Sequence, residues 1–371
     1  MKVAQFVDTM VLGGAETMAL RLSVALRRAD IDVVLFCFES PRLLELTEEL
    51  DIPYEILPHW SWYKSKATLP RFALHFRRRL MSRGCNVLHS HLLGATIAAG
   101  LSVPLTSIRH VATIHDTYTL AEKPSLIRML RALSHWRTEI AAVSSAVESH
   151  LRGLGGFRLS RLHTVPNGVE SPSLLSAQQR QTVRQSLGLV AEDYALICVA
   201  RMVPLKAHGV LLEALALLDA CPFVKLLLVG SGPQDHDLRS LARDWHLDAR
   251  VHFLGERTDV PRLLQAADCF VLSSDTEGLS CSVLEAMAAG LPCVVTDVGG
   301  NRELIEPDST GFLLPPRDPA AFARAIRTLS GDIGLGQACG VRARARVETE
   351  FSLDRMVERY VRLYSGPTRS R

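Results

Sequence analysis

Short apolar runs alternate with helical patterns along almost all of the 371 residues, and this alternation constrains the fold more than any other feature. In the first half, predicted strands lie at 3–7, 32–38, 54–57, 86–91, 111–114, 139–143 and 162–165. A second series has predicted strands at 194–200, 224–229, 251–253, 269–272, 292–296 and 311–314. Repeated strand–helix units of this length are typical of parallel sheets with helices on both faces. We therefore predict an α/β protein.

The alternation breaks around residues 168–176, where turn residues and Pro172 interrupt it. We place a domain boundary there, with an N-terminal Rossmann-like domain at 1–170 and a C-terminal one at 171–351. Doubly wound sheets bind ligands at the carboxyl ends of their strands. Two such domains in tandem are expected to face each other across a cleft that holds the site.

Composition limits the class of protein. The chain is 47% hydrophobic and 22% charged, which suits a globular protein with a sizeable core. A net charge of +3 argues neither for nor against an anionic partner, and we expect no nucleic-acid ligand. The eight cysteines are scattered without a Cys-x-x-Cys, which favours free thiols in a reducing compartment. The N-terminus lacks a signal-like segment, so we expect a cytoplasmic protein.

Residues 60–83 combine seven lysines and arginines with Trp60, Trp62 and Tyr63. Such a segment fits peripheral contact with an anionic membrane at the inner face. A helix that covers a sheet and turns a basic face to solvent explains the pattern too, and we favour that interpretation.

A stretch at residues 274–292 carries the clearest candidate chemistry. It follows an apolar run at 269–273, passes through a loop containing Glu277 and Gly278, and enters a helical pattern that ends at Gly290. Ser280 or Ser282 is the expected N-cap. A loop that runs into a helix N-terminus suits a phosphate, because backbone N–H groups and the helix dipole point there. The acids of this stretch suit sugar hydroxyls, although acids near a helix start also favour the dipole alone.

Further candidates follow other predicted strands. Arg201 and Lys206 come after the strand at 194–200 and could neutralise a departing diphosphate. His115 directly follows the strand at 111–114 and could bond a sugar hydroxyl. Gly13 and Gly14 open a helix after the first strand and allow close approach of a phosphate, although a tight turn explains them equally.

We expect no metal site. His89 and His91 lack a third ligand at sensible spacing, so we interpret them as structural or cleft-lining. Two Asp-x-Asp pairs exist, at 30–32 and 235–237. The first lies at the wrong end of a strand, and the second suits a helix start.

In combination, these residues resemble the GT-B glycosyltransferases, specifically the large family 4 of retaining enzymes, also called group 1. The most specific match is Glu277-Gly-Leu-Ser-Cys-Ser-Val-Leu-Glu285, with seven residues between the acids. Supporting pieces are Gly13-Gly-Ala-Glu16, Thr113-Ile-His-Asp116, Ala142-Val-Ser-Ser145, Pro166-Asn-Gly-Val169, Arg201 with Lys206, Gly230-Ser-Gly-Pro233, Phe253-Leu-Gly-Glu-Arg257 and 295–305. The chain departs from the commonest form of the family motifs at two positions. Cys281 stands where a small or hydroxyl residue or proline is common, and Ala207 stands where glycine is frequent.

The resemblance implies roles for these residues. Arg201 and Lys206 would bind the donor diphosphate, Glu277 the transferred sugar, and Glu285 the ribose. Backbone N–H groups of Gly278, Leu279, Ser280 and Cys281 would contact the phosphates and sugar. Gly13 and Gly14 would close over the diphosphate, His115 would line the sugar site, and the segment of Arg257 would lie by the nucleobase. The C-terminal helix within 352–371 would pack back onto the first domain.

The implied reaction is metal-independent transfer of a hexose-type sugar, with retention, from a UDP-, GDP- or ADP-sugar to a hydroxyl, without a further cofactor. Surface polysaccharide, lipopolysaccharide or glycolipid assembly is the expected setting, with a glycan or lipid-linked acceptor. A small-molecule acceptor, a nucleotide-sugar epimerase on the same architecture and a catalytically idle sugar-nucleotide-binding subunit are the alternatives. Acceptor choice is expected from loops near 10–12, 59–67 and 117–124. The sequence does not indicate an oligomeric state.

Overall fold

The computed structural model describes residues 1–8 and 13–366, so the predicted acceptor loop at 10–12 lies outside the described residues. The chain forms two compact units, Met1–Asn167 with Leu353–Arg371, and Gly168–Ser352. The first unit ends three residues before the expected boundary at 170. The reason is that Val169 N–H donates to Phe351 O at 3.0 Å, which ties the chain after Asn167 into the second unit.

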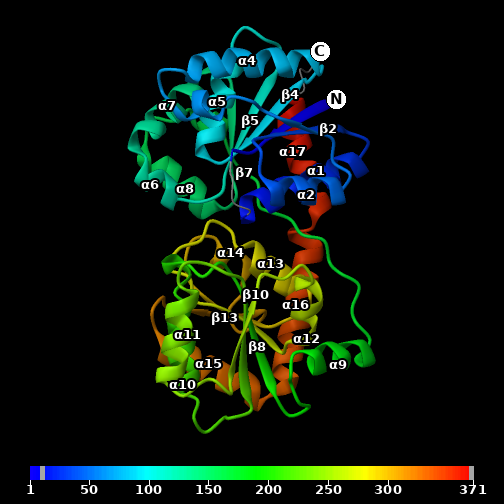
Figure 1. The fold of residues 1–371 in the computed structure, drawn as a ribbon, viewed down its shortest axis with the longest axis vertical. Coiled ribbons are helices and arrows are strands. Elements are labelled where there is room, and N and C mark those ends of the chain that lie inside the picture. The colour runs from blue at the N-terminus through cyan, green and yellow to red at the C-terminus, as the bar shows by residue number, and fades with distance from the viewer. Residues whose placement is uncertain (9–12, 367–371) are drawn as a thin grey trace. The chain divides into compact units, whose positions relative to one another are not determined.

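The first unit is built on a seven-stranded parallel sheet in the order β3-β2-β1-β4-β5-β6-β7 (Figure 1). Its strands are β1 (Lys2–Phe6), β2 (Asp32–Cys37), β3 (Tyr54–Ile56), β4 (Val87–His91), β5 (Arg109–Ile114), β6 (Thr138–Ala142) and β7 (Leu162–Thr164). Its helices are α1 (Gly14–Arg28), α2 (Pro41–Glu49), α3 (Trp60–Lys64), α4 (Leu69–Ser82), α5 (Leu93–Ser102), α6 (Tyr118–Glu122), α7 (Pro124–Trp136), α8 (Ser145–Leu154) and α17 (Leu353–Ser365). The strand order reverses between β1 and β4, which is where doubly wound sheets bind ligands.

The second unit repeats this design with a six-stranded parallel sheet in the order β10-β9-β8-β11-β12-β13. Its strands are β8 (Tyr194–Val199), β9 (Val224–Val229), β10 (Val251–Gly255), β11 (Cys269–Leu272), β12 (Cys293–Thr296) and β13 (Gly311–Leu314). Its helices are α9 (Ala177–Ser186), α10 (His208–Ala216), α11 (Asp235–Asp244), α12 (Val260–Ala266), α13 (Cys281–Ala288), α14 (Asn301–Leu304), α15 (Pro319–Gly331) and α16 (Ile333–Glu350). The predicted α/β class with two doubly wound parallel sheets is confirmed.

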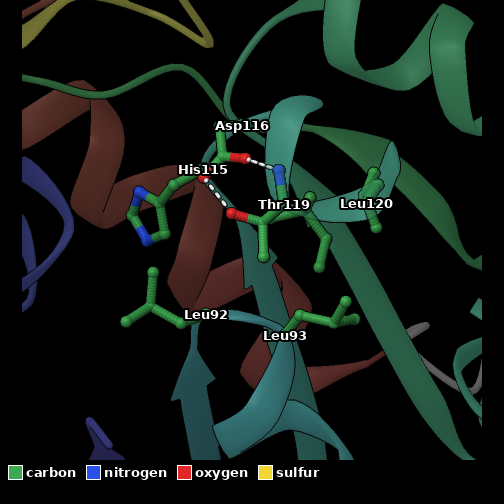
Figure 2. A pocket seen from close by; sticks show the side chains of 7 residues that line it. Leu92, Leu93, His115, Asp116, Thr119 and Leu120 are labelled. Atoms are coloured by element: carbon green, nitrogen blue, oxygen red, sulfur yellow. Dashed lines mark hydrogen bonds between the residues drawn. The ribbon is translucent and has the colours of Figure 1, made fainter. Parts of the chain in front are cut away.

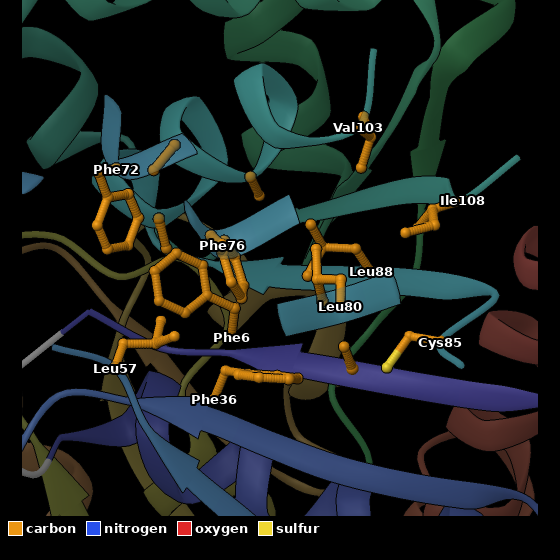
Figure 3. Close-up of a cluster of buried hydrophobic side chains, with 14 of the residues drawn as sticks. Phe6, Phe36, Leu57, Phe72, Phe76, Leu80, Cys85, Leu88, Val103 and Ile108 are labelled. Carbon is orange, nitrogen blue, oxygen red and sulfur yellow. The ribbon is translucent and has the colours of Figure 1, made fainter. Parts of the chain in front are cut away.

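A cluster of phenylalanines forms the core between α4 and one face of the first sheet (Figure 3). The ring of Phe76 lies 4.8 Å from that of Phe6 on β1 and 5.3 Å from that of Phe36 on β2, measured between centroids. Phe72 and Leu80 on the same side of α4 are fully buried. These contacts fix which face of α4 points outward.

Helix α17 belongs to the first unit although it follows the whole second unit in sequence. Tyr360 and Tyr364 are buried and reach the strands through their hydroxyls. The Tyr360 hydroxyl lies 2.8 Å from Thr113 Oγ1 on β5, and the Tyr364 hydroxyl lies 2.7 Å from His89 Nδ1 on β4. Burying two phenols is favourable only because each hydroxyl finds such a partner.

Helix α9 was not predicted, since its sequence is almost entirely polar. It begins with a capping box, in which Ser176 Oγ accepts from Gln179 N–H at 3.2 Å and the Gln179 side chain accepts from Ser176 N–H at 2.9 Å. Arg184, which is 3% exposed, then pairs with Asp268 at 3.0 Å. Polar contacts rather than an apolar stripe hold this helix, so hydrophobic periodicity does not reveal it.

Candidate functional site

The loop after β11 and helix α13 form the expected strand–loop–helix arrangement. Ser280 is the N-cap of α13, and its Oγ accepts from Val283 N–H at 3.4 Å. Gly278, Leu279 and Ser280 are buried at the helix start, Cys281 is the first residue of α13, and Glu285 lies one turn further on. The segment therefore brings backbone amides and the positive end of a helix dipole to the carboxyl edge of the second sheet.

Lys206 and Glu277 meet at this edge. Lys206 ends a short 3₁₀ turn (Pro204–Lys206) after β8, and its Nζ lies 2.5 Å from Glu277 Oε1. Ser274, which is fully buried, donates to the same carboxylate oxygen at 2.6 Å. The Glu277 side chain is only 9% exposed and that of Lys206 22%. Among the described residues none donates to Glu277 Oε2, which leaves that oxygen for a ligand.

The turn that carries Lys206 is fixed by the neighbouring strand. Ala207 has φ +48°, a left-handed conformation that is unfavourable for a residue with a Cβ. Buried Ser273 donates to the carbonyls of Lys206 and Ala207 at 3.1 and 2.9 Å, and Asp275 N–H donates to Leu205 O at 2.8 Å. The left-handed φ gives a physical reason for the glycine that family 4 often has here.

The loop after β12 holds Glu277 from the other side. Gly299 has φ +53°, and a Cβ placed there would lie 1.8 Å from Glu277 O. Gly300 N–H donates to Gly278 O at 2.9 Å, and Thr296 Oγ1 donates to Ser274 O at 2.6 Å. Only a glycine at 299 allows the two loops to pack this closely.

Arg201 follows β8 and is exposed. The backbone around it is clamped by the loop after β9, because Met202 N–H donates to Ser231 O at 2.7 Å. Gly230 and Gly232 have φ of +133° and +157°, and Cβ atoms there would meet the carbonyls of Ala200 and Met202 at 2.2 and 2.4 Å. Within the described residues the Arg201 guanidinium has no hydrogen-bonding or ionic partner, so it is available to an anion.

Arg257, which we expected to lie near the nucleobase, forms a bidentate salt bridge with Asp259 just after β10. Its Nε and Nη2 lie 2.8 Å from the two carboxylate oxygens. This hydrogen bonding raises the pKa of Arg257 and lowers that of Asp259. The pairing directs the guanidinium to a protein carboxylate, and a role at the nucleobase stays a prediction. The bidentate pair of Arg317 and Asp275, at 3.0 and 2.9 Å, has no counterpart in the sequence-based predictions.

The first unit contributes a separate set of residues at the carboxyl end of its own sheet. Figure 2 shows a small pocket lined by Leu92, Leu93, His115, Asp116 and Thr119 together with neighbouring apolar side chains. Asp116 accepts from Thr119 N–H at 2.7 Å and from Thr119 Oγ1 at 3.2 Å. Leu92 has φ +73°, a strained value for a branched residue, and such strain concentrates at functional sites.

His115 is the end of a short hydrogen-bonded chain. His91 Nε2 lies 2.8 Å from Gln5 Oε1, and His91 Nδ1 lies 3.1 Å from His115 Nε2. The Gln5 carbonyl oxygen only accepts, so His91 carries its proton on Nε2 and accepts on Nδ1 from His115 Nε2–H. Neutral His115 then has Nδ1 as its acceptor. Burial lowers the pKa of His115 to about 4 and that of His91 well below its usual value, so both are neutral at pH 7.

His89 and His91, interpreted from sequence as structural or cleft-lining, have different surroundings. His89 is enclosed by Tyr364 and Thr113, whereas His91 contacts the candidate residue His115. Gly13 precedes α1, and its N–H donates to Glu16 Oε2 at 2.8 Å, while Gly14 is the first helical residue. Among the described residues, no group of three or more His, Cys, Asp or Glu could hold a metal ion.

Comparison with known proteins matches both halves of the chain to families. The family described as "Glycosyltransferase Family 4" matches residues 12–171, and "Glycosyl transferases group 1" matches residues 193–332. The protein EpsD of Bacillus subtilis (strain 168) is 34% identical over 224 residues, which is 59% of this chain and only 58% of that protein.

Two other proteins align over nearly the full length. The UDP-Gal:alpha-D-GlcNAc-diphosphoundecaprenol alpha-1,3-galactosyltransferase of Escherichia coli is 23% identical over 98% of this chain and 96% of its own. The crystal structure of Anabaena HepE in complex with UDP and glucose superposes with a TM-score of 0.89, at 23% identity, over 99% of this chain and 100% of that one. The paired-glutamate segment, the two parallel sheets and these matches together show that the chain is a glycosyltransferase of GT-B fold and belongs to family 4, group 1.

Proposed function

We propose that the second unit binds a nucleotide-sugar donor and that the enzyme transfers a hexose-type sugar to a hydroxyl with retention of configuration. The observation that carries the proposal is the contact of Lys206 and Glu277 at 2.5 Å beside the N-terminus of α13. A cation and a helix start suit a diphosphate. A carboxylate with an unoccupied oxygen suits sugar hydroxyls.

In the proposed reaction the bond between the sugar C1 and the diphosphate oxygen breaks and a bond from C1 to the acceptor oxygen forms on the same face. The acceptor proton passes to the departing phosphate. Lys206 and Arg201 stabilise the negative charge that develops on the diphosphate, which is the main electrostatic demand of the step. Glu277 orients the sugar, and neutral His115 accepts from a hydroxyl through Nδ1.

We propose that these two cations take the role that a divalent metal has in other sugar transferases. Retention is proposed from the membership of family 4, and the same-face path is proposed because no carboxylate among the described residues is identified as a nucleophile for a covalent intermediate. Turnover that persists in EDTA, and an α-configured product from an α-linked donor by NMR, are the expected results. Loss of activity in EDTA with rescue by Mg²⁺ or Mn²⁺ would refute metal independence.

For the acceptor we propose a glycan or lipid-linked saccharide of surface polysaccharide, lipopolysaccharide or glycolipid assembly. The support is the Escherichia coli relative, whose name specifies a diphosphoundecaprenol-linked acceptor. A small-molecule acceptor remains the alternative. Lipid-linked acceptors reside in membranes, so we also propose peripheral contact through residues 60–83. No helix among the described residues is long and apolar enough to span a bilayer. The free state of all eight cysteines supports a cytoplasmic location.

The donor is found by measuring the melting temperature with UDP-, GDP- and ADP-sugars, since a ligand that binds only the folded state raises it. The best donor is then incubated alone and with lipid-linked or free sugar acceptors. A new glycoside formed only with acceptor supports transfer. Conversion of the donor sugar without any acceptor would support an epimerase. If no nucleotide sugar shifted the melting temperature, the donor assignment would be refuted.

A further inference from the structure

The net positive charge of the first unit is concentrated in one part of its sequence, because that part lacks acidic residues. Residues 56–115 contain eight lysines and arginines and no aspartate or glutamate, and helix α7 has no acid either. The whole chain has a net charge of only +3, so other parts are correspondingly acidic. An uneven distribution of this kind points to an anionic partner on one face.

Helix α4 turns cations and large apolar side chains outward together. Its Phe72, Phe76 and Leu80 side is buried against the sheet (Figure 3), so the opposite side faces solvent. That side presents exposed arginines and, between them, Leu74 at 45% and Met81 at 61% exposure. The four outward residues are Arg71, Leu74, Arg78 and Met81, a spacing that places them on one helix face.

The loop after α5 adds an apolar tip framed by arginines. Leu105 is 95% exposed, and Trp136 at the end of α7 is 55% exposed. Arg77 Nε donates to Ser102 O at 2.8 Å, and Arg137 Nη1 donates to Thr106 O at 2.9 Å. Because α5 packs against both α4 and α7, this loop lies between the two helices. The arginines hold the loop and retain further N–H groups for an anion.

Aromatic rings with cations above them flank the start of α4. Lys64 Nζ lies 4.2 Å from the centre of the Trp60 ring, and the Arg71 guanidinium lies 4.0 Å from that of Trp62. Arg79 and Arg83 share the buried carboxylate of Glu55 and are therefore partly neutralised. Lys64 also interacts electrostatically with Asp8, whereas Arg71, Arg77 and Arg78 of α4 form no ion pair with any of the described residues.

We propose that this surface, defined by Arg71, Leu74, Arg78, Met81, Leu105, Trp136 and Arg137, docks on a bilayer that contains anionic phospholipids. The arginines match lipid phosphates, and the four large apolar side chains enter the interface between headgroups and acyl chains. A nucleic acid would match the charge but would leave Leu74, Met81 and Leu105 in water. The proposal deepens the peripheral contact proposed above for residues 60–83 and rests on that proposed function. Vesicle binding is measured without donor or acceptor, so its failure would leave the donor assignment unaffected.

Co-flotation of the full chain with vesicles tests this surface. Vesicles of 30% phosphatidylglycerol and 70% phosphatidylcholine are expected to bind the protein, and pure phosphatidylcholine vesicles are not. Binding should weaken as salt increases. Arg71→Ser with Arg78→Ser should lower the partition coefficient on the order of tenfold or more, as expected for the loss of two charges near an anionic surface. Leu105→Asn, which tolerates the left-handed φ of +62°, should weaken binding without changing charge.

The matched control removes two exposed arginines of the second unit, Arg262→Ser with Arg324→Ser, and should bind like the parent. Quenching of tryptophan emission by brominated lipids should fall in Trp136→Phe. Melting temperatures of all variants report folding separately. Equal binding to neutral and anionic vesicles, no binding to either, or unchanged binding of both the double arginine and Leu105 variants would overturn the proposal. Binding of heparin that Leu105→Asn leaves unaffected, together with no binding of vesicles, would indicate a nucleic-acid-like polyanion instead.

Discussion

Replacing Lys206 by methionine tests the centre of the proposed donor site. The ammonium donates at 2.5 Å to a carboxylate that is only 9% exposed, so its removal leaves Glu277 with the Ser274 hydroxyl alone. Hydrogen bonds to charged groups contribute about 1.5–3 kcal/mol. Because Lys206 keeps 22% exposure, we expect Lys206→Met to lower the free energy of unfolding by about 1–2 kcal/mol. Urea unfolding measures this.

The effect on turnover should be larger than the effect on stability. Loss of one preorganised group that stabilises developing negative charge typically lowers kcat by about 10²–10³, or roughly 2.7–4 kcal/mol. Affinity for the nucleoside diphosphate should fall as well. The double variant Lys206→Met with Glu277→Gln should regain stability, because no unpaired charge remains, and should stay inactive.

Lys225 is the matched control. Its side chain is 19% exposed, and its Nζ lies 3.9 Å from Asp193, so it resembles Lys206 in burial and in having an acidic neighbour. Lys225→Met should change stability by a comparable or smaller amount and leave turnover unchanged. If Lys206→Met retained both parental turnover and nucleotide affinity, the reasoning about the diphosphate site would be wrong.

Three further substitutions and conditions have defined outcomes. Ala207→Gly relieves the left-handed φ of +48° and should raise the unfolding free energy by about 0.5–1 kcal/mol with activity retained, whereas a fall would contradict the strain argument. Gly299→Ala should lower kcat at least about tenfold, because the new Cβ would collide with Glu277 O. Gly188→Ala is the control, because Gly188 has φ +75° and an added Cβ would meet no neighbouring atom. It should lower the free energy of unfolding only by the cost of the left-handed backbone conformation. Buried neutral His110 has its pKa lowered to about 3, so the unfolded state takes up its proton first and stability should fall by up to about 1.4 kcal/mol per pH unit below 6.5. Urea midpoints at pH 7.5, 6.0 and 5.0 measure this, and His110→Gln should reduce the slope.

Much of the fold follows from the sequence because parallel strands buried on both faces read as continuous apolar runs. The positions of Lys206, Glu277 and His115 at strand ends were predictable for the same reason, since each directly follows such a run or its turn. Helix α9 and the short helix α3 could not be found in this way. The position of α9 depends on its capping box and on Arg184, and that of α3 depends on aromatic packing. Neither helix has a stripe of apolar residues.

Several side-chain pairings, local as well as distant in sequence, were beyond prediction. Ser274 is unremarkable in sequence, and only its burial beside Glu277 shows that it fixes the carboxylate. The contact between His89 and Tyr364 joins residues 275 positions apart. No local pattern encodes such a pair, because it depends on the return of α17 to the first unit. Side chains alternate between the two faces of a strand, so the sequence indicates that His89 and His91 lie on the same face of β4. This alternation was the only sequence signal for their proximity.

The way Glu277 is held bears on what the proposed site does before and during reaction. Lys206 and Ser274 both occupy Oε1, so the carboxylate is oriented without a donor, and Oε2 needs no rearrangement to accept a sugar hydroxyl. The ammonium has three hydrogens, and one is used by Glu277. The remaining two can reach phosphate oxygens, and their attraction grows as the diphosphate gains negative charge. An interaction that strengthens along the reaction lowers the barrier, whereas one that is equal throughout only improves binding. Removing the Lys206 ammonium should therefore change kcat more than KM. Removing the Ser274 hydroxyl, which contacts Glu277 rather than the diphosphate, should change KM more than kcat.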